Sequence, residues 1–135
     1  TAWAHYLVML EGYRRHAVLA VRSFERGLRL AKRGDTVQAS EKLYKAVEEG
    51  IKALAMAKDL DEARRALRRR GWSTRLLNRA AAKLGETALR AWYAGYYLHV
   101  EGFHEARLGM EELGITIPLI EPLIQEVRRL LDERS

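Results

Sequence analysis

Arginine is concentrated in the middle of the chain, around a tryptophan, and this segment is the first candidate for a functional site. A guanidinium group pairs with phosphate oxygens and an aromatic ring stacks on a base, so the combination is typical of a contact with nucleic acid or a nucleotide. The other interpretation is a solvated arginine-rich surface, common in thermophiles, with the tryptophan packed between short helices. The candidate nucleic-acid-binding residues are Arg64, Arg65, Arg68, Arg69, Arg70, Trp72, Arg75 and Arg79.

Two histidines and two glutamates that lie close together in the sequence are the candidates for acid–base catalysis: His99, His104, Glu101 and Glu105. A carboxylate next to an imidazole can orient the ring for proton transfer. Five residues along an α-helix amount to a rotation of roughly 140°, so His99 and His104 are expected to point apart and not to share a zinc ion. We therefore predict no metal site and no cofactor, and a structural role is the alternative for each histidine.

The composition limits the classes of function. The 135 residues include no cysteine, which excludes disulfides, thiol nucleophiles and thiolate metal sites and favours a cytoplasmic location. The net charge of +6 permits an acidic partner such as RNA. No apolar run approaches the roughly 20 residues needed to cross a bilayer, so no membrane association is expected. The excess of arginine over lysine, with very little asparagine or glutamine, is typical of a thermophile.

The clearest element is a helix over residues 34–58. Asp35 is expected to cap its first turn, with Gln38 completing a capping box after Gly34 ends the preceding helix. An apolar stripe faces a core, whereas glutamates placed four residues ahead of lysines are expected to form ion pairs on a solvated side. The stripe consists of Ser40, Leu43, Tyr44, Val47, Ile51 and Leu54, and Ala39, Ala46 and Ala53 form a seven-residue repeat beside it.

Helical periodicity also covers the rest of the chain, without strand-like alternation. Residues 1–33 form a long helix in this interpretation, with Leu7 and Phe24 on its buried side. The other predicted helices span residues 61–70, 73–83 and 86–113, followed by a connector at 114–117 and a last helix from Pro118. The predicted fold is therefore all-α: a single domain over residues 1–135, built as an up-and-down helical bundle of four long helices plus one or two short helices.

The predicted helix over residues 86–113 carries aromatic side chains on two adjoining faces. Trp92 and Tyr96 lie on one face, and Tyr93 and Tyr97 lie on the other. Core packing accounts for the first face, and a second one indicates burial between further helices or a subunit interface. We therefore predict a homodimer.

Two stretches resemble the archaeal paralogous-repeat (PaREP) family. The stretch GDTVQASEKLYKAVEEGIKALA begins at Gly34 and is similar to the family pattern GDYxQASEKLWxAxxxAIKALA, and LHVEGFHE, which begins at Leu98, is similar to LHxNFYE. The biochemical function of that family is unassigned. Its helical arrangement is similar to that of the HEPN superfamily (higher eukaryotes and prokaryotes nucleotide-binding), which implies a helical bundle that is usually dimeric.

The HEPN resemblance implies two kinds of function. Some branches are ribonucleases with an Arg-x(4–6)-His motif, and the nearest approach here is Arg90 with His99, which have eight residues between them and fall on opposite faces of a helix. We therefore expect a non-enzymatic binding or interaction module that contacts RNA or a nucleotide through its arginines. The alternative is an endoribonuclease, or a toxin–antitoxin or nucleotidyltransferase partner, with a non-standard arginine–histidine site.

Overall fold

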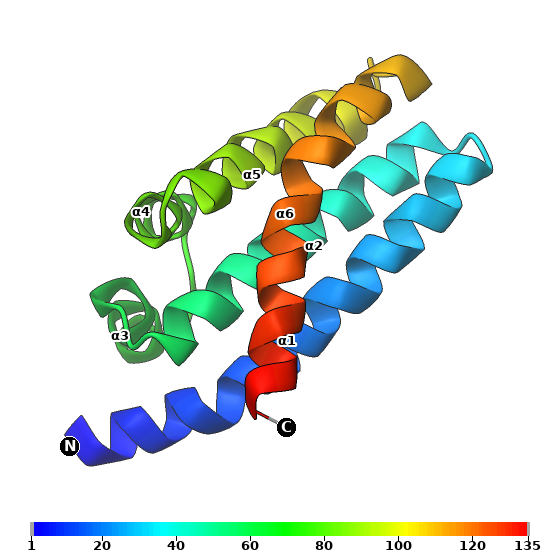
Figure 1. Cartoon of the computed structure of the whole chain (residues 1–135). Coiled ribbons are helices and arrows are strands. Elements are labelled where there is room, and N and C mark those ends of the chain that lie inside the picture. Colours follow the sequence, from blue (N-terminus) through cyan, green and yellow to red (C-terminus); the bar gives the residue numbers. More distant parts are fainter. Residues whose placement is uncertain (1, 135) are drawn as a thin grey trace.

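Helices account for every regular element in the described part of the chain, residues 2–134, in the computed structural model of the protein (Figure 1). Side chains are described over this range except at positions 5, 6, 9, 10, 11 and 134. The elements are α1 (Ala2–Lys32), α2 (Thr36–Ala57), α3 (Asp61–Arg69), α4 (Thr74–Leu84), α5 (Glu86–Tyr97), the π-helix η1 (Leu98–His104) and α6 (Met110–Arg134). The predicted all-α bundle is confirmed. Among the described residues, no helix is long and apolar enough to cross a membrane.

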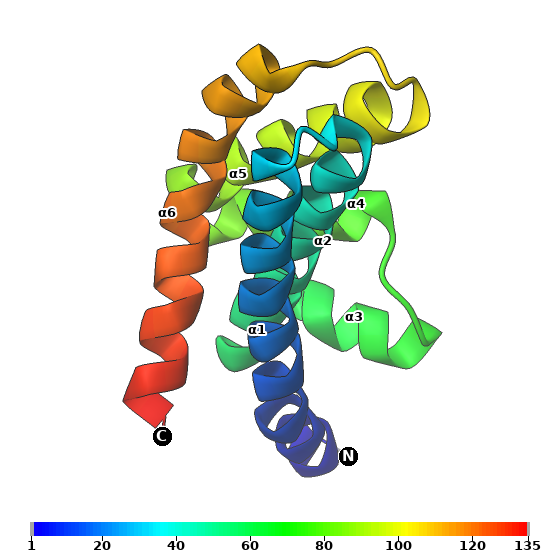
Figure 2. The same ribbon diagram turned by 90° about the vertical axis from the view of Figure 1, so that its right-hand side faces the viewer.

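α2 is the central element. It contacts each of the other helices, and α1 packs along it as the first half of a helical hairpin (Figures 1 and 2). The helix begins as predicted, because the Asp35 carboxylate accepts a hydrogen bond from the backbone N–H of Gln38 at 3.0 Å. Gly34 turns the chain between the two helices with a φ of 81°, a left-handed conformation that a residue without a Cβ adopts at no steric cost.

The buried side of α2 is wider than its periodicity indicates. The predicted stripe and the three alanines are buried, but so is Glu49, which is only 2% exposed. The expected ion pairs were Glu41 with Lys45 and Glu48 with Lys52, and the structure pairs these residues differently. Glu41 contacts His99 of η1, Glu48 contacts Lys45, and Lys52 contacts Glu49. The reason is that other helices approach α2 from several directions, which the pattern of one helix does not reveal.

The first turns of α1 project beyond the rest of the bundle (Figure 2). Leu7, predicted to be buried, is 39% exposed. Further along the helix, Tyr13, Ala17 and Phe24 lie in the core. The apolar periodicity of α1 therefore continues past the point where partner helices are present to cover it.

The short helices α3 and α4 form the predicted excursion between the long ones. Ser73 caps α4, because its Oγ accepts a hydrogen bond from the N–H of Leu76 at 3.2 Å. At the end of α3 the left-handed residue is Arg70, with a φ of 60°, and not the glycine that follows it. The N–H of Gly71 bonds back to the carbonyl of Ala66 at 2.9 Å and closes the helix.

The prediction of one helix over residues 86–113 was wrong in its second half. The chain stays helical to His104, but it changes from α to π geometry after Tyr97, and residues 105–109 then connect to α6. The last helix begins at Met110 rather than at Pro118, so the predicted connector at 114–117 lies inside α6.

Two prolines, Pro118 and Pro122, lie within α6. Each lacks the N–H that would bond to the carbonyl four residues earlier. Both prolines are exposed and share one face of the helix, so the carbonyl groups left without a partner are open to water. The buried side of α6 is formed by Ile120, Leu123, Ile124 and Val127. Burial of this side outweighs the local cost of the prolines. The rule that proline occupies the first turn of a helix therefore placed the start of α6 too late in the sequence.

The first aromatic face of α5 is buried only in part. Trp92 is 2% exposed and its ring centroid lies 6.1 Å from that of Tyr44, which confirms core packing for this residue, whereas Tyr96 on the same face is 38% exposed. Tyr93 and Tyr97 on the second face are 58% and 40% exposed. The homodimer inferred from this second face stays a prediction.

Candidate functional site

A cavity of about 460 Å³ opens between α1, the end of α2 and α3. Its walls combine apolar side chains with two guanidinium groups, an imidazole and an indole. The residues that line it, here called the α1–α3 groove, are Val8, Gly12, Arg15, His16, Met56, Ala63, Ala66, Leu67, Arg70, Gly71 and Trp72. This composition suits a ligand with a flat apolar part and an anionic part.

Arg70 and Trp72 bring the predicted arginine-rich segment into this groove. Arg70 holds a left-handed conformation that costs a residue with a Cβ on the order of 1 kcal/mol. Its backbone N–H is fixed by the carbonyls of Ala66 and Leu67 at the end of α3. Trp72 is partly buried against the core and also lines the groove, so it has both the packing role and the accessible surface that the sequence left as alternatives.

The other predicted arginines divide into one that is engaged and five that are exposed. The Nε of Arg64 donates to Asp59 at 2.8 Å, and this hydrogen bond lowers the pKa of the Asp59 carboxyl and raises the pKa of Arg64. The exposed members are Arg65, Arg68 and Arg69 on α3, with Arg75 and Arg79 on α4. Of the predicted set, Arg70 and Trp72 are the members that line the groove together with residues of α1.

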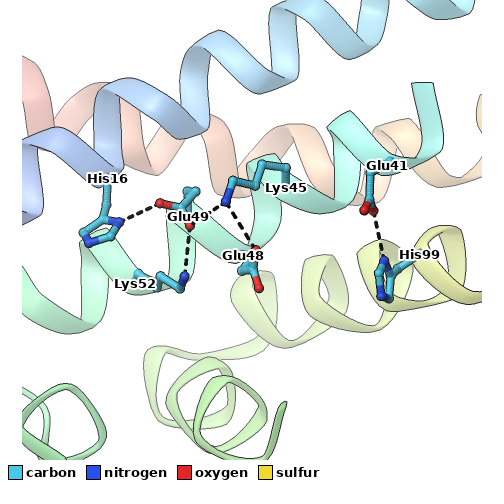
Figure 3. Close-up of polar contacts among 7 residues, drawn as sticks. All are labelled: His16, Glu41, Lys45, Glu48, Glu49, Lys52 and His99. Carbon is cyan, nitrogen blue, oxygen red and sulfur yellow. Dashed lines mark hydrogen bonds and ion pairs between the residues drawn. The ribbon is translucent and has the colours of Figure 1, made fainter. Parts of the chain in front are cut away.

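A buried carboxylate supports the α1 side of the groove. Glu49 of α2 accepts a hydrogen bond from Nδ1 of His16 at 2.6 Å and pairs with Lys52 at 3.0 Å (Figure 3). Burial by itself would raise the pKa of Glu49, but the hydrogen bond from His16 and the charge of Lys52 outweigh it and lower that pKa to about 2. An ionised carboxylate only accepts hydrogen bonds, so Nδ1 of His16 carries a proton and its ring orientation is fixed.

A second site lies where η1 packs on the first half of α2. The Nε2 atom of His104 is 3.2 Å from the Nε2 atom of His99. The two rings are nearly perpendicular, with their centroids 4.4 Å apart. The expectation that these histidines point apart was therefore wrong.

The π geometry of η1 explains this contact. A π-helix closes its hydrogen bonds between residues five apart, so side chains at this spacing lie over each other, whereas in an α-helix they do not. The N–H of Glu105 bonds in this register to the carbonyl of Val100 at 2.9 Å. Gly102, between the histidines, lies so close to α2 that a Cβ at this position would be 2.2 Å from Oγ of Ser40. η1 thus presents both histidines on one side.

His99 is held by a carboxylate and by aromatic rings. Oε1 of Glu41 lies 2.9 Å from Nδ1, which assigns the proton of the neutral ring to Nδ1 and leaves Nε2 free to accept from His104 (Figure 3). The Tyr44 ring stacks on His99 with a centroid distance of 4.2 Å. Burial, and then the negative charges of Glu48 and Glu41, raise the pKa of Tyr44, so this ring stays neutral.

The two glutamates predicted beside the histidines do not join them. Glu101 and Glu105 pair instead with Arg107, at 3.8 Å and 3.4 Å. The carboxylate that contacts His99 comes from α2. Within the part of the chain that the structure describes, no group of three or more histidine, aspartate and glutamate side chains is placed to hold a metal ion.

The family of the chain follows from comparison with known proteins. The model of the archaeal PaREP1/PaREP8 family matches residues 15–124. The chain belongs to this family. A crystal structure of a protein from Sulfolobus solfataricus is 30% identical, with 84% of this chain and 96% of that chain covered and a TM-score of 0.77. A solution structure of the Orf c02003 protein is 29% identical, with 87% and 94% covered and a TM-score of 0.75. No curated protein matches the chain.

The PaREP1/PaREP8 match confirms the predicted family and covers His99 and His104 together with all of the α1–α3 groove except Val8 and Gly12. It begins at Arg15, on the wall of the α1–α3 groove, and extends beyond His99 and His104. The projecting first turns of α1 lie outside the matched range.

Sequence reasoning missed four residues that complete these sites: Arg15, His16, Glu41 and Glu49. Each is an ordinary polar position in the pattern of its own helix, and its role depends on a partner at least 33 positions away. One signal was available: Glu41 belongs to the first PaREP-like stretch, and both histidines belong to the second.

Proposed function

We propose that this PaREP1/PaREP8 protein is a non-enzymatic module that binds single-stranded RNA through the α1–α3 groove. The observation that carries the proposal is the meeting of Arg15, Arg70 and Trp72 around one cavity. An indole gives a base a surface on which to stack, and guanidinium groups pair with phosphate oxygens. The net charge of +6 supports an acidic partner.

The arginines of α3 favour a polynucleotide over a single nucleotide. Arg68 and Arg69 immediately precede Arg70 and are exposed, so cationic groups continue beyond the groove itself. A mononucleotide would occupy the groove alone, whereas a strand carries phosphates at regular intervals that these side chains can neutralise.

Replacing Arg68, Arg69 and Arg70 together by glutamine is expected to weaken RNA binding. Each phosphate contact releases counterions from the RNA when the protein binds, and this release makes the affinity depend on salt. Loss of three contacts with single-stranded RNA should therefore reduce the slope of log affinity against log salt concentration by about 2 in magnitude. Fluorescence anisotropy of a labelled oligoribonucleotide, measured at several salt concentrations, gives both the affinity and the slope.

The matched control replaces Arg22, Arg26 and Arg29 by glutamine. These are three exposed arginines on α1, and their replacement changes the net charge by the same amount. The control protein should bind RNA with nearly the wild-type slope. An equal loss in both triple variants would point to unspecific charge attraction, and unchanged binding in the first would remove the arginine-rich segment from the site.

A second candidate function is that of an endoribonuclease, and the contact between His99 and His104 favours it. The two Nε2 atoms lie 3.2 Å apart, so the two rings are placed to act as the general base and the general acid of one reaction. In such a reaction the neutral ring takes the proton of the ribose 2′-hydroxyl, whose oxygen attacks phosphorus. The bond from phosphorus to the 5′ oxygen then breaks, and the protonated ring gives its proton to that oxygen.

The endoribonuclease function is tested with purified protein and a mixed RNA pool in the presence of a chelator. Cleavage should yield 2′,3′-cyclic phosphate ends, and His104→Ala should lower the rate about 100-fold or more, because His104 would act as a general acid or base. His5→Ala is the matched histidine control and should retain the wild-type rate. Intact RNA after incubation with wild-type protein would leave RNA binding as the function.

A further inference from the structure

We propose that His99 and His104 form a binding site for a divalent transition-metal ion of the Zn²⁺ type, with the two Nε2 atoms as ligands. This site lies on η1, away from the α1–α3 groove, and does not depend on RNA binding or cleavage. Four observations support it: the distance between the nitrogens, the tautomer that Glu41 imposes, the rings that hold His99, and the exposure of His104.

The distance between the two nitrogens matches a shared ion. With Zn–N bonds of about 2.0–2.1 Å, two ligands of a tetrahedral site are about 3.3 Å apart. The Nε2 atoms of His99 and His104 are 3.2 Å apart. An ion can therefore bind between them with a very small movement of either ring.

The tautomer of His99 is the one that a metal ligand needs. Glu41 accepts the proton on Nδ1 at 2.9 Å, which leaves the lone pair of Nε2 directed at His104. A carboxylate that binds the far nitrogen of a ligating histidine orients the ring and increases its basicity, and this arrangement is common around zinc. Glu41 is then a positioning residue and not a ligand.

The surroundings hold His99 in place and leave the ion accessible. Tyr44 stacks on one side at 4.2 Å, and the Phe103 ring lies roughly parallel to the imidazole at 6.3 Å. His104 is exposed, so an ion can enter without unfolding of η1. Preorganised ligands lose little side-chain freedom when the ion binds.

The chain supplies two ligands, and this limits the kind of ion and its affinity. Among the described residues there is no third histidine, aspartate or glutamate in position, so water completes the coordination. Imidazole nitrogens suit Zn²⁺, Cu²⁺ and Ni²⁺, whereas Mg²⁺ and Ca²⁺ prefer oxygen ligands. We expect binding weaker than in closed structural zinc sites, with open positions on the ion.

The experiment is a titration of tag-free protein with Zn²⁺ by isothermal calorimetry, and with Co²⁺ by visible absorption. One ion per chain is expected, with d–d bands of Co²⁺ that change on binding. His104→Ala and His99→Ala should each abolish binding. Glu41→Gln should lower the affinity roughly 10-fold to 100-fold, because the carboxylate that orients His99 is lost.

His5→Ala is the matched histidine control and should bind as the wild type does. Circular dichroism of each variant separates loss of the site from loss of the fold, and the exposed position of His104 makes His104→Ala the safest variant in this respect. Absence of Zn²⁺ binding, or binding that survives His104→Ala in a folded protein, would overturn the proposal. An unchanged affinity in Glu41→Gln would overturn the positioning role of Glu41.

Discussion

Gly102→Ala is expected to lower the free energy of unfolding by about 2–3 kcal/mol, the upper part of the range of roughly 1–3 kcal/mol that is typical of a side chain forced into a packed contact. A Cβ at this position would stand 2.2 Å from Oγ and 2.6 Å from Cβ of Ser40. The Cβ of Ser40 belongs to the rigid part of that side chain, so η1 must move away from α2. Urea unfolding followed by circular dichroism measures the loss, and the Zn²⁺ titration shows whether the movement also separates His99 from His104.

Two further substitutions make this expectation specific. Gly114→Ala is the matched control, because Gly114 lies in α6 with open space around it, and alanine should stabilise the helix by about 0.5–1 kcal/mol. Ser40→Gly combined with Gly102→Ala removes the colliding atoms and should restore much of the lost stability, whereas Ser40→Ala keeps the Cβ and should not. A Gly102→Ala protein as stable as the wild type would contradict the close approach of η1 and α2.

Glu49→Gln is expected to destabilise the protein by about 3 kcal/mol at pH 7, the penalty typical of breaking a buried ion pair. Glu49 is 2% exposed, accepts a hydrogen bond from His16 and pairs with Lys52 and Lys45 (Figure 3). Glutamine has nearly the same shape but no charge, so the largely buried ammonium group of Lys52 loses its carboxylate. Urea unfolding of the two proteins at pH 7 gives the difference.

The same substitution should remove an acid-dependent part of the stability. The pKa of Glu49 falls from 4.5 to about 2 on folding, so its contribution is complete above pH 4.5 and is lost as the pH falls towards 2. The difference between wild type and Glu49→Gln should therefore be constant from pH 7 to 5 and shrink between pH 4.5 and 2. Urea unfolding at several pH values measures this convergence.

Glu121→Gln is the matched control for Glu49→Gln, because Glu121 is an exposed glutamate on α6. Its replacement should change the stability by less than about 0.5 kcal/mol, as is usual for surface positions. A difference between wild type and Glu49→Gln that stays the same down to pH 2 would contradict the ionised, buried state of Glu49.

Much of the fold could be predicted from short-range signals. Asp35 caps α2 as expected, the short helix predicted from residue 73 is present as α4, and the apolar stripe of α2 is in the core. Such signals are reliable because a cap or an apolar stripe depends on residues within one or two helical turns of each other, which are also neighbours in the sequence. The family prediction rests on the same central helix and is confirmed.

The errors occur where packing overrides a local rule. Pro118 normally starts a helix or breaks one, yet α6 continues through it because the opposite side of the helix is buried. Leu7 fits the apolar periodicity of α1 but is 39% exposed, because no partner helix covers this face of the first turns. In both cases the outcome depends on whether a partner helix buries that face. The free energy of this burial is larger than the conformational preference of a single residue.

The arginine-rich segment and the histidines were found in the sequence as separate candidates. Which of them meet other groups was decided by tertiary structure. Trp72 and Arg70 line one groove with Arg15 only through the tertiary arrangement of α1, α2 and α3, and His99 reaches Glu41 only because η1 packs on α2. His99 and His104 contact each other because η1 adopts a π register where it packs on Ser40. The spacing of an α-helix had predicted that the two side chains point apart. The sequence therefore determined the helices and the family, through contacts between near neighbours, whereas the partners of the candidate residues depend on contacts between distant segments that no local pattern records.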